Sequence, residues 1–144
     1  MIAVNEFRFL VMCLDPHKVA PDFFTLGMVV NHIGVPGKRF PVEVTMHAVV
    51  GAIIRPPTVG KRLDLMGWAL GENGERESIP GLKGQRYTIG GDQLGPACLL
   101  YKVTVPFQKP GIHGFDLFDP DGAFGKLDGL LATYLYSIGA PAQG

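Results

Sequence analysis

The sequence predicts an all-β fold, an antiparallel β-sandwich of the immunoglobulin-like or jelly-roll-like type with about eight strands. Twenty glycines and twelve prolines interrupt the 144 residues at short intervals. Between them lie runs of about 7 to 12 residues rich in Val, Ile, Leu, Phe, Tyr and Thr, as in sandwiches and barrels. No window between these breaks carries the i, i+3, i+4, i+7 stripe of an amphipathic helix.

The first half of the chain contains four predicted strands: Phe7–Leu14, Phe23–Ile33, Pro41–Arg55 and Lys61–Leu70. Asp15-Pro16 is expected to end the first, because proline cannot donate to a strand ladder. Gly51 in the third predicts a bulge or bend. Asn73-Gly74 after the fourth predicts a tight hairpin, because both residues tolerate positive φ.

A short return strand is expected at Glu75–Ile79, followed by the least regular segment, 80–96. Within that segment only Gln85–Ile89 has the pattern of a strand. A connection of this length usually crosses between sheets or serves function.

Three further strands follow: Cys98–Phe107, Ile112–Phe118 and Leu130–Ile138. The turn Asp119-Pro120-Asp121-Gly122 separates the last two. A short helix at Lys126–Leu131 is an alternative for the start of the last element, but Gly129 and Thr133–Tyr136 favour a strand. Residues 139–144 are expected to fray, and residues 1–144 to form one domain.

Three strand segments are apolar on both faces: Phe7–Leu14, Ala48–Ile54 and Leu130–Leu135. A sheet with one wet face should instead alternate apolar and polar residues. These strands therefore need a cover for their second face. A subunit interface and the segment 80–96 folded over the sheet are the two candidates.

The composition narrows the function classes. Hydrophobic residues make up 47% of the chain and charged residues 18%, and thirteen basic residues balance thirteen acidic ones. A balanced charge disfavours nucleic acid and anionic membrane as partners. The low charge favours a homo-oligomer or a protein partner. The N-terminus lacks a signal-peptide pattern and no apolar run reaches about 18 residues, so a cytoplasmic protein without membrane spans is expected.

Both cysteines, Cys13 and Cys98, sit inside apolar runs. The simplest interpretation is two buried small hydrophobic residues, whose surroundings raise the thiol pKa and blunt reactivity. A disulfide between facing strands is left open.

The histidines do not follow the spacings of known zinc motifs. They are His17, His32, His47 and His113. A hairpin could bring His32 and His47 together, although unrelated edge histidines are the simpler interpretation. No metal site is predicted.

Asp116, Asp119 and Asp121 form an acidic cluster at one predicted turn. Calcium prefers such oxygen ligands. The same Asp-Pro-Asp-Gly stretch is also what a tight turn requires, and this interpretation is favoured. Whether the three carboxylates bind a cation is left open.

No catalytic or cofactor-binding residue is assigned, and no cofactor is expected. Ser78 and Ser137 lie outside any G-x-S-x-G elbow. The glycines at 81, 84, 90 and 91 match no phosphate-binding motif. Trp68 is expected to be the aromatic centre of the core.

An early strand carries Leu26-Gly27, and a late hairpin motif follows near the C-terminus. That motif comprises Pro110-Gly111, Phe115, Leu117 and Asp121-Gly122. In these features the chain resembles a family of small uncharacterised bacterial β-sandwich proteins. The resemblance implies the sandwich fold and no activity.

These observations favour a non-enzymatic interaction or assembly module that associates with itself, through sheet faces or edge strands. Two alternatives remain. One is a structural component of a virus-like or phage-like particle or appendage. The other is a small metal-dependent binder or enzyme that uses the acidic turn.

Overall fold

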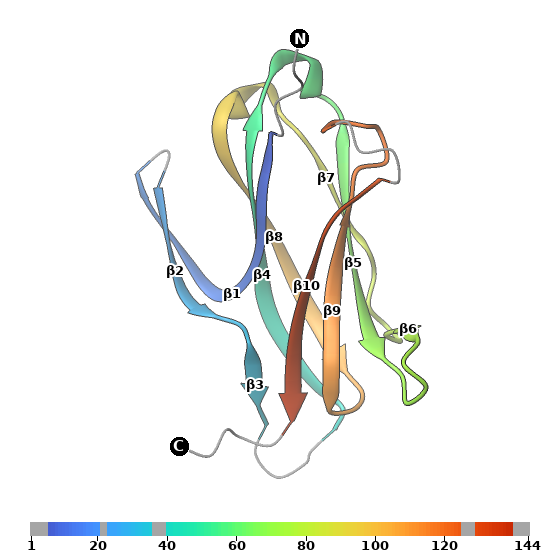
Figure 1. Cartoon of the computed structure of the whole chain (residues 1–144). Helices are drawn as coiled ribbons and strands as arrows, with labels where there is room; N and C mark the ends of the chain where they lie inside the picture. Colours follow the sequence, from blue (N-terminus) through green and yellow to red (C-terminus); the bar gives the residue numbers. More distant parts are fainter. Residues whose placement is uncertain (1–5, 21–22, 36–39, 125–128, 140–144) are drawn as a thin grey trace.

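The computed structural model describes residues 6–20, 23–35, 40–124 and 129–139, which form two β-sheets packed as a sandwich (Figure 1). Sheet A has the strand order β2 (Phe23–Val29), β1 (Phe7–Ala20), β4 (Val42–Ile54) and β8 (Gly95–Phe107). Sheet B has the order β3 (His32–Gly34), β10 (Leu130–Gly139), β9 (Gly111–Phe118), β5 (Arg62–Leu70) and β6 (Arg76–Ser78), and β7 (Gln85–Thr88) also pairs with β5. Two single-turn 3₁₀ helices, η2 (Pro56–Thr58) and η3 (Gly91–Gln93), lie in connections. The predicted all-β sandwich is confirmed, with ten strands rather than about eight.

Every strand pair is antiparallel except β3 with β10. The longest ladder joins β4 to β8 without a register shift, from Val42 opposite Phe107 to Ile54 opposite Gly95. Strands β8 and β9 are consecutive but belong to different sheets, so the chain crosses the sandwich at Gln108–Pro110.

Side chains along each strand point alternately to the two faces of the sheet, and those on the inner faces form the core. In β4 the even-numbered residues face sheet B, and three of them, Met46, Ala48 and Val50, are fully buried. An aromatic cluster from both sheets fills one part of the core, with Phe107, His113, Phe115 and Tyr136 in ring contact.

Trp68 is not the centre of this core, contrary to the prediction. Leu65 and Ala69 of the same strand, β5, belong to the core cluster. Side chains alternate along a strand, so the even-numbered Trp68 lies on the face opposite to these odd-numbered residues. Its ring covers Gly114 on the outer face of sheet B and lies under the Arg76 guanidinium, 4.4 Å from the ring centroid. Trp68 is still only 8% exposed.

The first strand was predicted to end at Asp15-Pro16, and this is wrong. β1 continues through Pro16, which lies opposite Leu26 of β2. Past Cys13, β2 is the one strand among the described residues that pairs with β1, because the pairing with β4 ends there. A proline without an N–H is tolerated where only one side of a strand is paired.

The predicted strand Phe23–Ile33 is in fact two strands. β2 ends at Val29 in sheet A, and β3 begins at His32 in sheet B, parallel to β10. The chain therefore changes sheet at Val30-Asn31, a point that no glycine or proline marks in the sequence.

Segment 80–96 crosses between the sheets, which was one of the two roles predicted for it. β7 pairs with Arg62–Leu65 of β5, along the same edge that β6 uses at Trp68–Leu70. The chain then passes through η3 into β8 of sheet A. The segment extends an edge of sheet B, so it does not provide the predicted cover for a sheet face.

Both predicted turns are present. Gly74 has φ +80° at the β5–β6 hairpin, and the Gly71 N–H donates to the Glu75 carbonyl across it. Gly122 has φ +67° in the turn after β9. The alternative helix at Lys126–Leu131 lies partly outside the described residues, and from Leu130 onward the chain is the predicted strand β10.

Candidate functional site

The carboxylate of Asp116 faces neighbouring side chains rather than a shared cation position. It lies on the outer face of β9 and is 6% exposed. The Thr133 hydroxyl donates to it at 2.7 Å, and Arg76 forms an ion pair with it. Arg76 also covers Trp68, so these four residues form one packed unit on sheet B.

Asp119 and Asp121 have separate partners as well. The buried Asp119 carboxylate accepts the backbone N–H groups of Ala123 and Phe124 and so caps the turn. Asp121 accepts the Arg62 guanidinium at 2.7 and 2.9 Å and the Arg62 backbone N–H at 2.9 Å, which holds the pKa of its carboxyl well below the usual value. Within the described residues, no group of three or more His, Cys, Asp or Glu side chains is placed to hold a metal ion.

Asp119→Ala is expected to lower the free energy of unfolding by about 1–3 kcal/mol, because two part-buried N–H groups lose their acceptor. Chemical denaturation followed by circular dichroism measures the loss. Asp121→Ala is the matched control on the same turn. It should lower the free energy of unfolding by less, because the Asp121–Arg62 ion pair is partly exposed to solvent. Equal losses for the two variants would contradict the capping role.

The two cysteines are not joined. Cys13 lies opposite His47 in the β1–β4 pair, whereas Cys98 lies opposite Gly51 in the β4–β8 pair. A whole strand therefore separates them, and the disulfide left open by the sequence is not formed. Partial burial raises the pKa of the Cys98 thiol.

The histidines are dispersed over the fold. His32 lies in β3 of sheet B, 2.7 Å from the Ser137 hydroxyl, and His47 lies in β4 of sheet A. The hairpin that would have brought them together does not exist, because the chain changes sheet before His32. His17 lies in β1, opposite Thr25.

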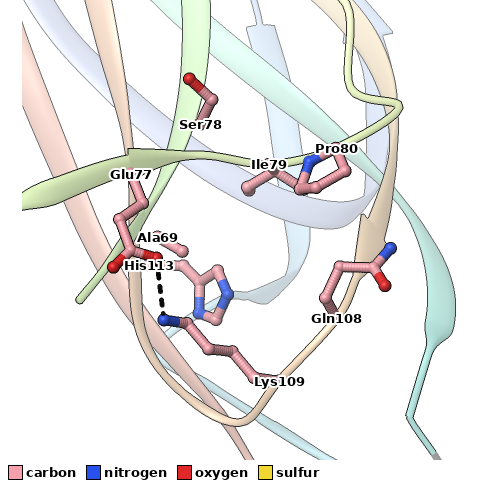
Figure 2. Close-up of a pocket in the computed structure, with 8 residues that line it drawn as sticks. All are labelled: Ala69, Glu77, Ser78, Ile79, Pro80, Gln108, Lys109 and His113. Carbon is pink, nitrogen blue, oxygen red and sulfur yellow. Dashed lines mark hydrogen bonds and ion pairs between the residues drawn. The ribbon is translucent and has the colours of Figure 1, made fainter. Parts of the chain in front are cut away.

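A pocket that the sequence did not predict surrounds His113, at one end of the sandwich (Figure 2). It has a volume of about 220 Å³. Its wall is formed by residues of β5 and β9, the β6 segment and the β8–β9 connection: Ala69, Glu77, Ser78, Ile79, Pro80, Gln108, Lys109 and His113. These residues come from segments distant in sequence, so no local motif signals the pocket.

The charged groups of the pocket are arranged at its rim. The Lys109 ammonium forms an ion pair with Glu77 at 3.1 Å, and both side chains are half-exposed. His113 is buried and its Nδ1 lies 3.0 Å from the Gly111 carbonyl, to which the protonated Nδ1 donates. Nε2 of the neutral ring is then an acceptor, so the pocket offers one buried acceptor beside a neutralised charge pair.

The stability of the fold should fall as the pH drops below about 6.5, in part through His113. Burial lowers the pKa of His113. Between its folded pKa and its higher unfolded pKa the unfolded chain binds more protons, so acid favours unfolding. Urea denaturation at pH 7.5 and 5.5 should show a smaller pH-dependent loss for His113→Gln than for the native protein. An unchanged loss would contradict this assignment.

Large apolar side chains are exposed on the outer faces of both sheets. On sheet B these are Met66, Ile112 and Leu135, which are 52%, 47% and 57% exposed. On sheet A they are Phe9 and Leu100, which belong to β1 and β8. Phe9 also borders a shallow groove of about 290 Å³ whose walls include Gly51, Ile53 and Cys98. Of the three strands predicted to be apolar on both faces, β1 and β10 leave part of the second face exposed through Phe9 and Leu135. In β4, Val49 on the outer face is fully buried.

One edge of sheet A is open over a long distance. β8 pairs with β4 along all of its 13 residues, and on its other side no described residue forms a backbone hydrogen bond with it. Leu100, Lys102 and Thr104 on this strand are exposed. A long unpaired edge is a template for another strand.

The chain matches no model of a known protein family, and no curated protein matches it. Among solved structures it is similar to the CARDB domain of a protein from Pyrococcus furiosus, determined in complex with di-metal ions. The two share 12% identity over 97% of this chain and 100% of that one, with a TM-score of 0.46. These values are low, so the fold assignment rests on the strand pairing described above.

Among the residues that the structure describes, no helix combines the length and the apolar character needed to cross a membrane.

Proposed function

We propose that this protein is a non-enzymatic interaction module that associates with itself. The observation that carries the proposal is the open edge of β8, which offers unpaired backbone groups beside exposed apolar side chains. Edge strands and apolar sheet faces are recurrent protein-binding surfaces. The resemblance to small bacterial β-sandwich proteins is part of the same proposal and adds no activity.

Two properties of the chain support a protein partner over other classes. Charges of both signs are balanced, so the chain has no net field that would attract a polyanion. Leu100 is exposed on β8 itself, beside the open edge, and would be covered by a protein contact there.

Sedimentation velocity of the purified protein over a range of concentrations tests the proposal. We expect a dimer or larger oligomer at micromolar concentration, with dissociation on dilution. A monomer at every concentration would refute self-association.

A further inference from the structure

We infer that two copies of this chain pair antiparallel through their β8 edges, about a two-fold axis at Tyr101. The two four-stranded A sheets then form one continuous sheet. The inference rests on the proposed self-association and specifies its surface, register and symmetry.

The hydrogen bonds of β4 show which groups of β8 are free. The Ile53 N–H donates to the Glu6 carbonyl, on the side of β4 away from β8. Backbone groups alternate in direction along a strand, so the even-numbered residues of β4 bond to β8. Their register partners are odd-numbered: Leu99 for Val50 and Tyr101 for Ala48.

The even-numbered residues of β8 therefore direct their backbone groups outward. They comprise two prolines at the ends and four residues with an N–H between them: Pro96, Cys98, Leu100, Lys102, Thr104 and Pro106. Proline is tolerated where its missing N–H would face away from the sheet. The two prolines thus bound a ladder of four free donors whose midpoint is Tyr101.

This arrangement is self-complementary. With the axis at Tyr101, Leu100 faces Lys102 of the second copy and Cys98 faces Thr104 of the second copy, so all four donors are used. Pro96 faces Pro106, where neither residue could donate. An isologous two-fold interface requires such a match of one segment with itself.

Neighbouring registers are less favourable. Moving the axis to Lys102 places the two Lys102 residues directly opposite each other, and like charges in that position are destabilising. The same shift faces Cys98 with Pro106, a pair that can exchange one hydrogen bond instead of two, because proline keeps its carbonyl but has no N–H. Moving the axis to Leu100 keeps the four donors paired, but it faces Lys102 with Cys98, which is smaller than Leu100, and Thr104 with Pro96, a pair that can exchange only one hydrogen bond.

The side chains also fit a second copy. Leu100 is exposed on the outer face of sheet A and would pack beside the aliphatic stem of Lys102 from the other chain. Lys102 keeps its ammonium in water in that position. In this register Leu100 of the second copy lies opposite Lys102. It covers the aliphatic stem of the lysine and carries no charge that would repel the ammonium.

Leu100→Pro removes one outward donor from the ladder and no hydrogen bond to β4. Because the substitution acts twice in a symmetric dimer, we expect the dimer dissociation constant to rise about tenfold or more. Sedimentation velocity measures it, and circular dichroism checks that the fold is retained. Leu100→Ala keeps the donor and should retain most of the dimer. Leu135→Lys, on the outer face of sheet B, should leave the dissociation constant unchanged.

A cross-link tests the register directly and does not depend on a weakened variant. Thr104→Cys should form a disulfide with Cys98 of the second copy on mild oxidation, because Cα atoms of a hydrogen-bonded antiparallel pair lie about 5.5 Å apart, within disulfide range. Adding Cys98→Ala should abolish the cross-linked dimer on a non-reducing gel.

The outcomes separate the inference from the proposed function. A monomeric native protein would overturn both. A native oligomer that survives Leu100→Pro unchanged and gives no Cys98-dependent cross-link would overturn the β8 pairing alone and leave self-association through another surface.

Discussion

Phe107→Ala is expected to lower the free energy of unfolding by about 3–5 kcal/mol, the largest effect of any single substitution considered. Phe107 ends β8 and is fully buried. Its ring meets His113 and Tyr136 edge-on, with centroids 4.9 and 6.0 Å apart. Removing the ring loses its transfer free energy and leaves a cavity that residues from both sheets would have to fill.

Phe9→Ala is the matched control for this substitution. Phe9 carries the same side chain on the same sheet, but it is 40% exposed on the outer face. Its loss should cost roughly 1 kcal/mol or less. Urea denaturation of both variants gives the comparison, and similar losses would show that Phe107 is not part of a tightly packed core.

Gly114→Ala is expected to lower the free energy of unfolding by about 1–3 kcal/mol, because the added methyl group overpacks its surroundings. A Cβ at this position would overlap the ring of Trp68. Trp68 is almost wholly buried and is held from above by Arg76, which is itself paired with Asp116, so the ring has no space to yield. The tryptophan emission spectrum should change together with the stability, because Trp68 is the single tryptophan of the chain.

Gly51→Ala is the control for Gly114→Ala. Its Cβ would overlap the ring of Phe9, a clash of similar closeness. Phe9 is partly exposed and can turn away into solvent, so the cost should be smaller than for Gly114→Ala. A larger loss at Gly51 would contradict the view that the Arg76–Trp68 contact makes sheet B rigid at this point.

Strand positions were predictable to within a few residues where a strand is bounded by turn residues. β4, β5, β9 and β10 each follow or precede a glycine or proline cluster, and their observed bounds match the predicted runs closely. The strand errors at Pro16 and Pro96 have a common cause. Both prolines lie inside strands where one side lacks a partner, and a sequence does not reveal which strand will be an edge.

The change of sheet between β2 and β3 was not predictable for a different reason. β3 is defined by its pairing with β10, about a hundred residues later, while the local residues form one apolar run. The same holds for the candidate sites: contacts between neighbouring residues were predictable from the sequence, and contacts between distant strands were not. The turn chemistry of Asp119 could be predicted from neighbouring residues, whereas the partners of Asp116 and the pocket at His113 depend on strands distant in sequence.

The long ladder between β4 and β8 has a consequence for how fast the fold can form. Its two strands are separated in sequence by the whole of β5, β6 and β7, yet they pair along 13 residues each. Closing that loop costs conformational entropy before the contacts of the paired residues stabilise the ladder. Topologies rich in such distant contacts fold in about milliseconds to seconds. During that interval β4 exposes both of its apolar faces, so this strand is where a newly made chain is most open to wrong partners.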